Sequence, residues 1–517
     1  GNAVDAAVAA AFVDCVVEPA MNGIGGEGVM AIHTADGTDV IIDYVGRPSH
    51  SCTPAMYDLY DDLEIGWMGW RRAKDDANVI GYKASTVPGT VAGLTKALEL
   101  YGTMELPEIM EPAIKIAEEG FAVGWWTVSH ILRTMGTFSR FPEWRKIFLI
   151  NGQYPPKPYM HSLRANPNIF VNKDLARSLT LIAQEGAEAF YQGEIAEAIA
   201  EDMANADGLI TMDDLDMYEP IITDPIPCGY RDCEVIYDPS HAGTTVMEAL
   251  NILEGFNLMD YGLGSFKHLH IMAEALGLAF ADRFEYMGDP GFVTVPQTGL
   301  VSKKYAQDLQ KRISFEKALT LTPGDPWSFE ECTTALTVVD EDRNAVVINQ
   351  TLVNSFGSGV GIAGTGIFMN NAMYGLNPEP GHANSIAGRK RRIQNVCPTI
   401  LLKNHVPFMT IGAPGGRAIQ SSIIQSIVHV IDFQMDIQSA IEAPRITREV
   451  GETMIDSRFS QETCDDLRTI GHQIAYIDKE IGNWARPVSI TIDAKQNVLN
   501  GGVEWHFLGF ESDAIGY

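Results

Sequence analysis

Positive charge is scarce in this sequence. It has 37 Lys and Arg residues against 67 Asp and Glu residues, which gives a net charge of −30. Such an acidic surface repels nucleic acid phosphates and anionic lipid headgroups, so we exclude both as main partners. No EF-hand loop is present, and we therefore interpret the acidity as a solubility feature and not as a sign of calcium binding.

Cysteine is also scarce, and the cysteines are scattered. None of them forms a C-x-x-C pair, and their number is odd, so the sequence predicts neither a zinc site nor a disulfide framework. This usage favours a reducing compartment and hence, slightly, a cytoplasmic localisation. The seven are Cys15, Cys52, Cys228, Cys233, Cys332, Cys397 and Cys464.

Long apolar runs are missing as well. The most apolar stretch, residues 6–17, carries Asp14 and is too short to cross a bilayer, so we expect no membrane span. The chain opens at Gly1 without an initiator Met, from which we expect the natural N-terminus and any leader to lie upstream. The 517 residues, 46% of them hydrophobic, are enough for an ample core and for one or two domains.

The periodicity of apolar residues predicts sheets covered by helices, an α+β architecture to which both halves contribute. The best boundary candidate is residues 321–328. Expected helices are 2–17, 90–101, 106–117, 173–185, 194–204, 245–253, 267–283, 419–433 and 437–443. Expected strands, besides the hairpin described below, are 29–33, 40–44, 234–237, 366–370, 399–402, 408–411 and 488–492.

Two local patterns invite a ligand-binding interpretation that we reject. The glycine-rich stretch 23–28 lies between a helix and a strand, whereas a dinucleotide loop follows a strand and opens a helix. We expect these glycines to let backbone segments pack closely. His268 and His270 are two residues apart on a helix and cannot share a face, so we expect one surface and one packed histidine and no metal pair.

Residues 333–351 predict a β-hairpin. An alternating apolar run ends in turn-forming polar residues, 340–344, and a β-branched run follows. If the hairpin is symmetric about Asp342, Thr333 pairs with Thr351, and directly opposed side chains lie within contact distance. By itself, a Thr-Thr pair that opens a hairpin is most often ordinary sheet surface.

A threonine hydroxyl becomes a good nucleophile only beside a base. A chain break between Cys332 and Thr333 would free the α-amino group of Thr333. Because such an amine titrates at roughly pH 8 in model peptides, it can be neutral at working pH and act as that base.

Several longer motifs follow one another along the chain. Upstream of the hairpin they are residues 1–7 with 23–26, 87–94, 112–120, 278–283 and 288–290. From the hairpin onward they are Thr333-Thr334 with 338–340, 356–359 and 412–416. In content and order, over nearly the whole chain, they resemble the γ-glutamyltranspeptidases and their acylase relatives, whose chain begins some tens of residues before this Gly1.

The resemblance implies an N-terminal-nucleophile hydrolase with a four-layer αββα sandwich and no cofactor or metal. It implies self-cleavage of one precursor between Cys332 and Thr333, into a large subunit, 1–332, and a small one, 333–517, and a homodimer of these pairs is a further expectation. Cys332 is unlike the polar residues expected before the cleaved bond, and we expect it to slow self-cleavage.

The resemblance also assigns roles to single residues. Thr333 would be the nucleophile and, through its α-amine, the general base, and Thr351 would orient it. Gly415 and Gly416 match the glycine pair whose N–H groups stabilise the oxyanion, although a Pro-Gly-Gly by itself is typical of a plain turn.

The departures from the family pattern concern the substrate. The Arg that binds the substrate α-carboxylate in glutamyl-specific members is Val45 here, and the nearest Arg is Arg47. Val353 replaces a family Asn, and Gln394 with Asn395 replaces a serine pair. The Gln and Asp that bind the substrate α-amine are Ala372 and Gly375. A site that leaves a zwitterion unpaired binds it poorly.

We therefore expect an amide hydrolase, acting on a small molecule, whose acyl group differs from γ-glutamyl. One alternative is a genuine γ-glutamyltransferase or glutathione hydrolase, in which Arg47, Gln394 and Asn395 rebuild the glutamyl site. A second alternative is an unprocessed, non-catalytic binding protein.

Overall fold

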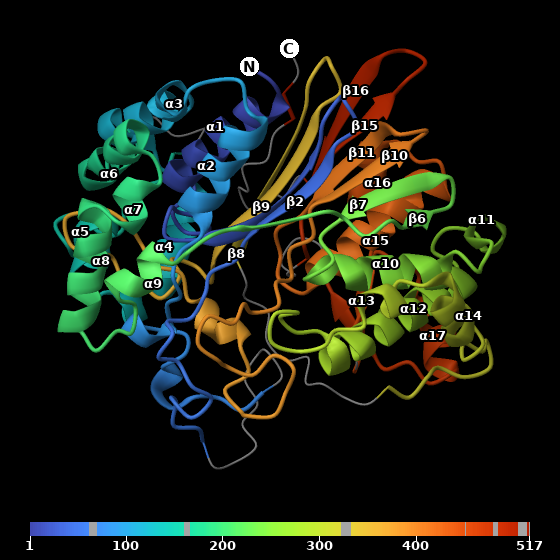
Figure 1. Cartoon of the computed structure of the whole chain (residues 1–517). Coiled ribbons are helices and arrows are strands. Elements are labelled where there is room, and N and C mark those ends of the chain that lie inside the picture. Colours follow the sequence, from blue (N-terminus) through green and yellow to red (C-terminus); the bar gives the residue numbers. More distant parts are fainter. Residues whose placement is uncertain are drawn as a thin grey trace.

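Two antiparallel sheets lie face to face between two layers of helices in the computed structural model of the chain (Figure 1). The structure describes residues 1–60, 70–159, 166–321, 332–449, 451–478, 484–504 and 514–515. This is the predicted four-layer αββα arrangement. In the described part of the chain, no helix is long and apolar enough to cross a membrane.

The first sheet combines strands from both sides of the expected cleavage point. Its described strands follow the order β5-β2-β1-β9-β8. They are β1 (Glu27–His33), β2 (Asp39–Tyr44), β5 (Ile221–Thr223), β8 (Cys332–Val339) and β9 (Ala345–Val353). Because β1 pairs with β9 along its whole length, a cut before Thr333 leaves the two products hydrogen-bonded in one sheet.

The second sheet follows the order β16-β15-β11-β10-β7-β6 in the described part of the chain. It also mixes the two segments, since β7 pairs with β10. Its strands are β6 (Gly229–Tyr230), β7 (Cys233–Tyr237), β10 (Thr399–Lys403), β11 (Val406–Gly412), β15 (Val488–Asp493) and β16 (Val498–Val503).

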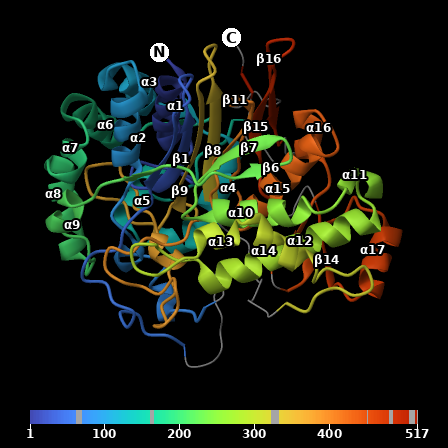
Figure 2. The same ribbon diagram turned by 45° about the vertical axis from the view of Figure 1, so that its right-hand side comes forward.

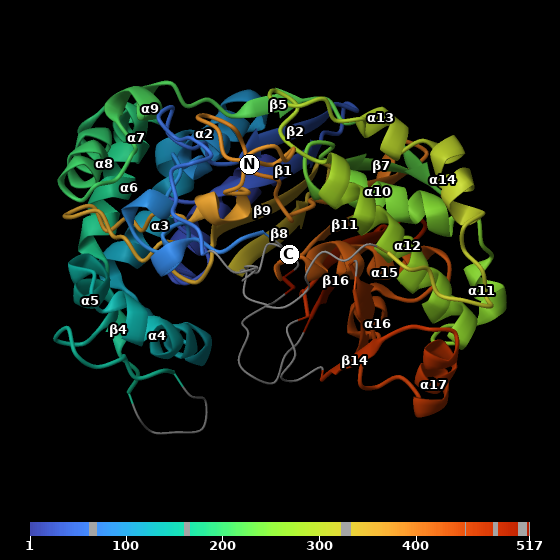
Figure 3. The same cartoon turned by 90° about the horizontal axis from the view of Figure 1, so that it is seen from below.

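Each sheet has its own helical layer, on the left and on the right of Figure 1. The first layer consists mainly of α1 (Ala3–Val17), α2 (Thr90–Tyr101), α3 (Leu106–Glu119), α6 (Lys173–Glu185) and α8 (Glu194–Asn205). The second consists mainly of α10 (Ala242–Leu253), α12 (Phe266–Tyr286), α15 (Ala418–Ile431) and α16 (Ile437–Glu442). Figure 2 shows α10 and α12 side by side in front of the second sheet, and Figure 3 shows the two helical layers flanking the strands from below.

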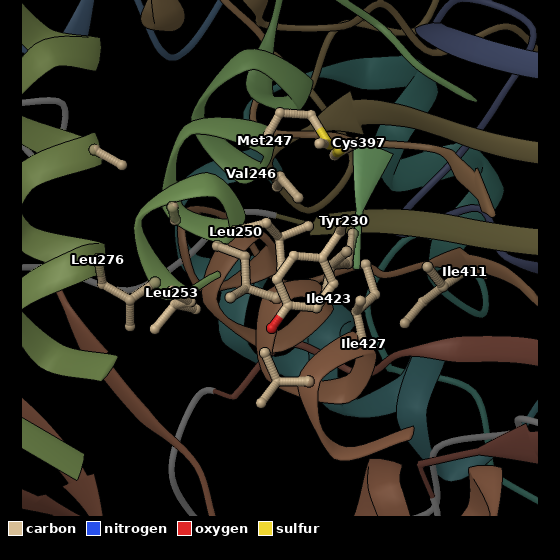
Figure 4. Close-up of a cluster of buried hydrophobic side chains, with 14 of the residues drawn as sticks. Tyr230, Val246, Met247, Leu250, Leu253, Leu276, Cys397, Ile411, Ile423 and Ile427 are labelled. Atoms are coloured by element: carbon tan, nitrogen blue, oxygen red, sulfur yellow. The ribbon is translucent and has the colours of Figure 1, made fainter. Parts of the chain in front are cut away.

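The second helical layer is joined to its sheet by a cluster of buried apolar side chains (Figure 4). Leu250 from α10 and Ile423 and Ile427 from α15 surround Tyr230 of β6, whose hydroxyl donates to Asp432 Oδ2 at 2.6 Å. Each such side chain contributes about 1.5–3 kcal/mol when fully buried, so this cluster fixes α15 against the sheet.

The side chains of β9 alternate between the two faces of the first sheet. Val346 and Ile348 belong to the cluster under α1 and α2, whereas Val347 belongs to the cluster shared with the second sheet. Beyond them, Gln350 Nε2 donates to Ala11 O on α1, while Asn349 Nδ2 donates to Ala413 O at the end of β11. Since this alternation has a period of two, Thr351 faces the second sheet.

The glycine-rich stretch acts as predicted, by allowing close backbone approach. A Cβ on Gly26 would lie 2.6 Å from Thr351 O, and one on Gly25 would lie 2.1 Å from Phe368 O. The predicted helix at 2–17 is α1, and Asn2 caps it by accepting hydrogen bonds from the N–H groups of Val4 and Asp5.

Two predictions were wrong. Residues 366–370 form a loop and not a strand, because the side chain of Asn370 bonds the backbone of Gly25 and Thr86. His268 and His270 are both buried, since α12 is covered on nearly all sides. The boundary candidate, residues 321–328, lies outside the described residues apart from Leu321.

Candidate active site

The hairpin of β8 and β9 has the predicted register. Ala335 pairs with Asn349 and Val339 pairs with Ala345, which places the centre of symmetry at Asp342. The backbone N–H of Asp340 donates to Asn344 O at 3.1 Å and closes the loop.

The regular ladder stops at Thr333. Thr334 still pairs with Gln350, but Cys332 pairs with Val353, so the single residue Thr333 lies opposite both Thr351 and Leu352. A bulge of this kind bends a strand and redirects its side chains. Thr333 and Thr351 are 6% and 1% exposed, so the two threonines lie buried on neighbouring strands, as the hairpin symmetry predicts.

The other threonine of the pair points to the opposite face. Thr334 Oγ1 donates to the carboxylate of Glu18, at the end of α1. Burial and the nearby Glu18 raise the pKa of Asp14 on the same helix. Thr334 therefore belongs to the helical side of the sheet, and Thr333 is the one of the two that can face the second sheet.

Thr351 is held by its own strand end. Its Oγ1 accepts a hydrogen bond from the backbone N–H of Val353 at 2.7 Å. Val353 has a φ of 83°, a left-handed conformation that a β-branched residue rarely adopts. The bulge and the strained residue together fix the position of the Thr351 hydroxyl.

Gly415 and Gly416 form the turn between β11 and α15. Gly415 has a φ of 131° and Gly416 a φ of 60°, and a Cβ on Gly415 would lie 2.3 Å from Ala485 Cα. The N-terminus of a helix carries unpaired N–H groups and favours negative charge. The bond from Asn349 to Ala413 O ties this turn to β9, two residues before Thr351.

A buried carboxylate that the sequence analysis missed lies next to Thr351. The β1–β9 ladder pairs Glu27 with Thr351, so the two side chains share a face. Glu27 Oε2 accepts from the Gly46 N–H at 2.7 Å, and its Oε1 accepts from Arg392 Nε at 2.7 Å and from Gln394 Nε2. The sequence did contain a signal for Glu27, because an acidic residue opens an apolar strand there. A charge buried at such a position needs a partner.

The three predicted substrate-binding residues differ in their placement. Gln394 joins the network around Glu27. Asn395 Oδ1 accepts from Arg283 Nη2 at 2.9 Å. Arg47 Nη2 donates to Glu219 O at 2.8 Å, and the Arg47 guanidinium lies over the ring of Tyr218.

A second charged network continues from Gln394. Arg391 bonds Asp43 and also Asp289 Oδ1, the latter at 2.7 Å, and His241 Nε2 donates to Asp43 Oδ2 at 3.1 Å. We assign the proton to Nε2 because His241 Nδ1 accepts the Gln394 N–H. Burial opposes ionisation of Asp43, but His241 and Arg391 outweigh it and hold the pKa of Asp43 well below its usual range.

One group of side chains in the described part of the chain has metal-ligand composition: His270, Glu274 and His472. His270 Nδ1 and His472 Nε2 are hydrogen-bonded at 2.8 Å, and Arg448 Nη1 lies 2.8 Å from Glu274 Oε1. Because the guanidinium already compensates the carboxylate, we interpret the group as an ion-paired cluster between the two segments and not as a metal centre.

Comparison with known proteins agrees with this architecture. The sequence model of γ-glutamyltranspeptidase matches residues 1–504. The chain is 39% identical to the acylase ACY 1 proenzyme of Pseudomonas sp. (strain SE83) and 35% identical to the glutathione hydrolase proenzyme of Escherichia coli (strain K12). Each alignment covers 92% of this chain, with 83% of the acylase and 82% of the glutathione hydrolase.

Among solved structures, the chain is similar to the cephalosporin acylase from Bacillus halodurans. The TM-score is 0.85 at 29% identity, over 100% of this chain and 92% of that one. The chain belongs to the γ-glutamyltranspeptidase family, whose members are autoprocessed N-terminal-nucleophile hydrolases and acyltransferases. It is therefore an enzyme of the amide-hydrolysing, N-terminal-nucleophile class, and the four-layer fold predicted from the resemblance is confirmed.

Proposed function

We propose that the chain is cut between Cys332 and Thr333, into segments 1–332 and 333–517, and that Thr333 is then the nucleophile of an amide hydrolase. The observation that carries the proposal is the bulge, which ends the β8–β9 ladder at Thr333, opposite Thr351. Both segments stay together because they share both sheets.

Self-cleavage needs only the groups of the polypeptide and one water. The Thr333 hydroxyl attacks the carbonyl of Cys332, and its proton passes to the departing Thr333 nitrogen, which leaves an ester between the two residues. Water then hydrolyses the ester, which gives a carboxyl group on Cys332 and a free α-amine on Thr333.

Amide hydrolysis repeats this chemistry on the substrate. The neutral α-amine takes the hydroxyl proton as Thr333 Oγ1 attacks the amide carbonyl, and it returns the proton to the leaving amine. Water hydrolyses the acyl ester and releases the acid. We assign the oxyanion to the N–H groups of Gly415 and Gly416, where one such donor typically contributes about 3 kcal/mol.

The acyl group that we propose is not γ-glutamyl. Ala372 and Gly375 are the ends of the 3-10 turn η3 (Ala372–Gly375) and offer no carboxylate to an α-ammonium group. Of the three side chains that could rebuild a glutamyl site, Gln394 is bonded to Glu27, whereas Arg47 and Asn395 bind Glu219 and Arg283. An unpaired ammonium group in a buried site costs binding energy.

One experiment tests processing and specificity together. On a denaturing gel, wild-type protein should give two fragments in place of the 56.6 kDa chain, and N-terminal sequencing of the smaller fragment should begin at Thr333. Thr333→Ala should stay intact and lose at least about a thousandfold of its activity. An active protein with an intact chain would overturn the proposal.

The substrate part is tested with p-nitroanilides. We expect turnover of anilides whose acyl group lacks an α-amine, and weak turnover of γ-glutamyl-p-nitroanilide. Efficient γ-glutamyl turnover by processed enzyme would instead support a glutathione hydrolase, the activity for which the Escherichia coli relative is named. An unprocessed, inert chain would support a binding protein.

A further inference from the structure

The proposed catalytic groups lie on two separate supports. Thr351 is part of β9 in the first sheet, whereas Gly415 and Gly416 follow β11 of the second sheet. Catalytic groups must be held within about 0.5 Å of their productive positions. Contacts that join the two supports should therefore influence the rate of the chemical step.

The helix α4 (Trp125–Phe138), at the lower left of Figure 3, rests on the first support. Side chains of α4 pack with Leu352 and Phe356 in one buried cluster. His130 Nδ1 and Ser355 Oγ share a hydrogen bond at 2.7 Å. These three partners lie at the end of β9 or directly after it, so α4 is fixed to the strand end that carries the orienting threonine.

The loop before β15 is fixed to the second support. The Arg486 N–H donates to Pro414 O at 2.9 Å. A Cβ on Gly415 would lie 2.3 Å from Ala485 Cα, so the backbone of this loop packs directly against the glycine turn. A shift of the loop would therefore displace the turn that carries the proposed oxyanion donors.

A contact between Arg486 and Trp126 joins the two supports, besides the bond from Asn349 to Ala413 O. The Arg486 Cζ atom lies over the Trp126 ring, 5.0 Å from its centroid. The Trp126 and His130 rings are 4.1 Å apart, centroid to centroid, and meet edge to face. Because a cation is attracted to the negative face of an indole, Trp126 holds the guanidinium and, with it, the loop.

His130 is neutral in this chain of contacts. Burial, Arg133 and Arg486 lower the pKa of His130 to about 3. A neutral imidazole does not repel the nearby guanidinium, so Arg486 and His130 can both lie against the Trp126 ring at working pH.

We propose that Trp126 and Arg486 are positioning residues, which hold the oxyanion turn at the distance from the threonine pair that amide attack requires. This inference rests on the proposed amide hydrolase activity and deepens it. In this role neither side chain touches the substrate, and both act through the backbone of Pro414 and Gly415. Their loss should slow the chemical step and leave substrate binding nearly unchanged.

The test measures kcat and KM with butyryl-p-nitroanilide, or with γ-glutamyl-p-nitroanilide if only that anilide is cleaved. The value of kcat is expressed per processed chain, as counted on a denaturing gel. We expect Arg486→Met and Trp126→Leu each to lower kcat by roughly 10-fold and to change KM by less than about twofold. Trp126→Phe keeps an aromatic face and should restore kcat to within about threefold of wild type.

The matched control is Arg468→Met. The Arg468 guanidinium lies over the ring of Tyr476 at 5.3 Å, so this variant also loses a cation–π contact within residues 333–517. Arg468 belongs to α17 (Gln461–Thr469) and Tyr476 to β14 (Ile474–Ile477), and neither element is part of the two central sheets. Arg468→Met should lower the thermal midpoint slightly and leave kcat unchanged.

Two milder variants keep the test decisive if a larger change prevents folding. Arg486→Lys keeps the charge but loses the planar guanidinium, and Ser355→Ala removes the hydrogen-bond partner of His130. Each should lower kcat by roughly threefold, again with little change in KM.

A double-mutant cycle separates one shared contact from two independent effects. If Trp126 and Arg486 act together, the double variant Trp126→Leu with Arg486→Met should be less than about twofold slower than the slower single variant, whereas independent effects would multiply to roughly 100-fold. Variants with wild-type kcat, losses confined to KM, or losses that multiply overturn the positioning role while the hydrolase proposal stands. A processed wild type that cleaves neither anilide overturns both.

Discussion

At the residue scale, the Thr351 hydroxyl is the feature most tightly defined by its surroundings. It is 1% exposed, it accepts the Val353 N–H at 2.7 Å, and it lies opposite Thr333 at the bulge. A hydroxyl can accept one hydrogen bond and donate another, and we propose that Thr351 orients Thr333 by donating to its oxygen.

The first prediction follows from this geometry. Thr351→Val keeps the shape of the side chain but removes the hydroxyl, and we expect kcat of processed enzyme to fall by roughly 10- to 30-fold with little change in KM. Thr351→Ser should restore most of kcat. A loss confined to KM, or a Ser variant as impaired as Val, would show that Thr351 acts through packing and not through its hydroxyl.

Residue-level prediction from the sequence worked where the signal was local. The register of residues 334–339 on residues 345–350 followed from the turn residues between them, because a hairpin fixes its own pairing, whereas the shift in register at Thr333 was not predicted. Glu27 and Arg392 are 365 positions apart and have no local pattern in common, so their contact could not be predicted.

At the element scale, the hairpin loop is connected to the first helix. Asp340 Oδ2 accepts from the Ala3 N–H at 2.9 Å and from Asn344 Nδ2 at 2.7 Å, and its Oδ1 accepts from the Asn344 N–H at 2.9 Å. This carboxylate closes the loop after β8 and also satisfies a free N–H at the start of α1. It thereby joins the two proposed segments at one end of the sheet.

The second prediction concerns this connection. Asp340→Ala removes three hydrogen bonds and a negative charge at a helix N-terminus, and we expect the free energy of unfolding to fall by about 2 kcal/mol in urea denaturation. Asp340→Asn should lose less, because the amide oxygen still accepts. The control is Glu341→Ala, at the next, exposed loop position, which should change stability by less than about 0.5 kcal/mol.

Elements were predicted well when their own periodicity or capping defined them. The helix at 173–185 agrees at both ends with α6, and 90–101 agrees with α2. The strand expected at 366–370 failed because the backbone there forms only an isolated bridge, between Gly361 and Phe368, and the side chain of Asn370 bonds the distant backbone of Gly25 and Thr86. Tertiary contacts overrode local propensity at that point.

At the scale of the whole molecule, several buried histidines make stability depend on pH. Burial lowers the pKa of His130, His268 and His472 to about 3 and that of His429 to about 4. In the unfolded chain each titrates near pH 6.5, so the unfolded state binds more protons below that pH. His270 also has a lowered pKa, whereas His241, Asp14 and Glu248 have raised pKa values and oppose the trend.

The third prediction is therefore acid sensitivity. Stability should be fully present above about pH 6.5 and should be lost progressively as pH falls from there toward the folded-state pKa values, by about 1 kcal/mol or more for each group by pH 5.5. The measurement is urea unfolding at pH 7.5, 6.5 and 5.5. His472→Asn should flatten the dependence, whereas His405→Asn, at an 84% exposed side chain, should not. A stability that rises on acidification would contradict the prediction.

The sequence alone determined the class of fold, the helices and strands with strong periodicity, the hairpin register and the threonine at its end, because each depends on residues close together in the chain. Only the tertiary structure decided what surrounds that threonine: the Glu27 carboxylate beside Thr351, the guanidinium of Arg392 in the space left by Gly375, and the placement of Arg47 on Glu219. Glu27 and Thr351, like Arg47 and Glu219, lie far apart in the chain, and chain folding brings them together without leaving a mark in any local pattern.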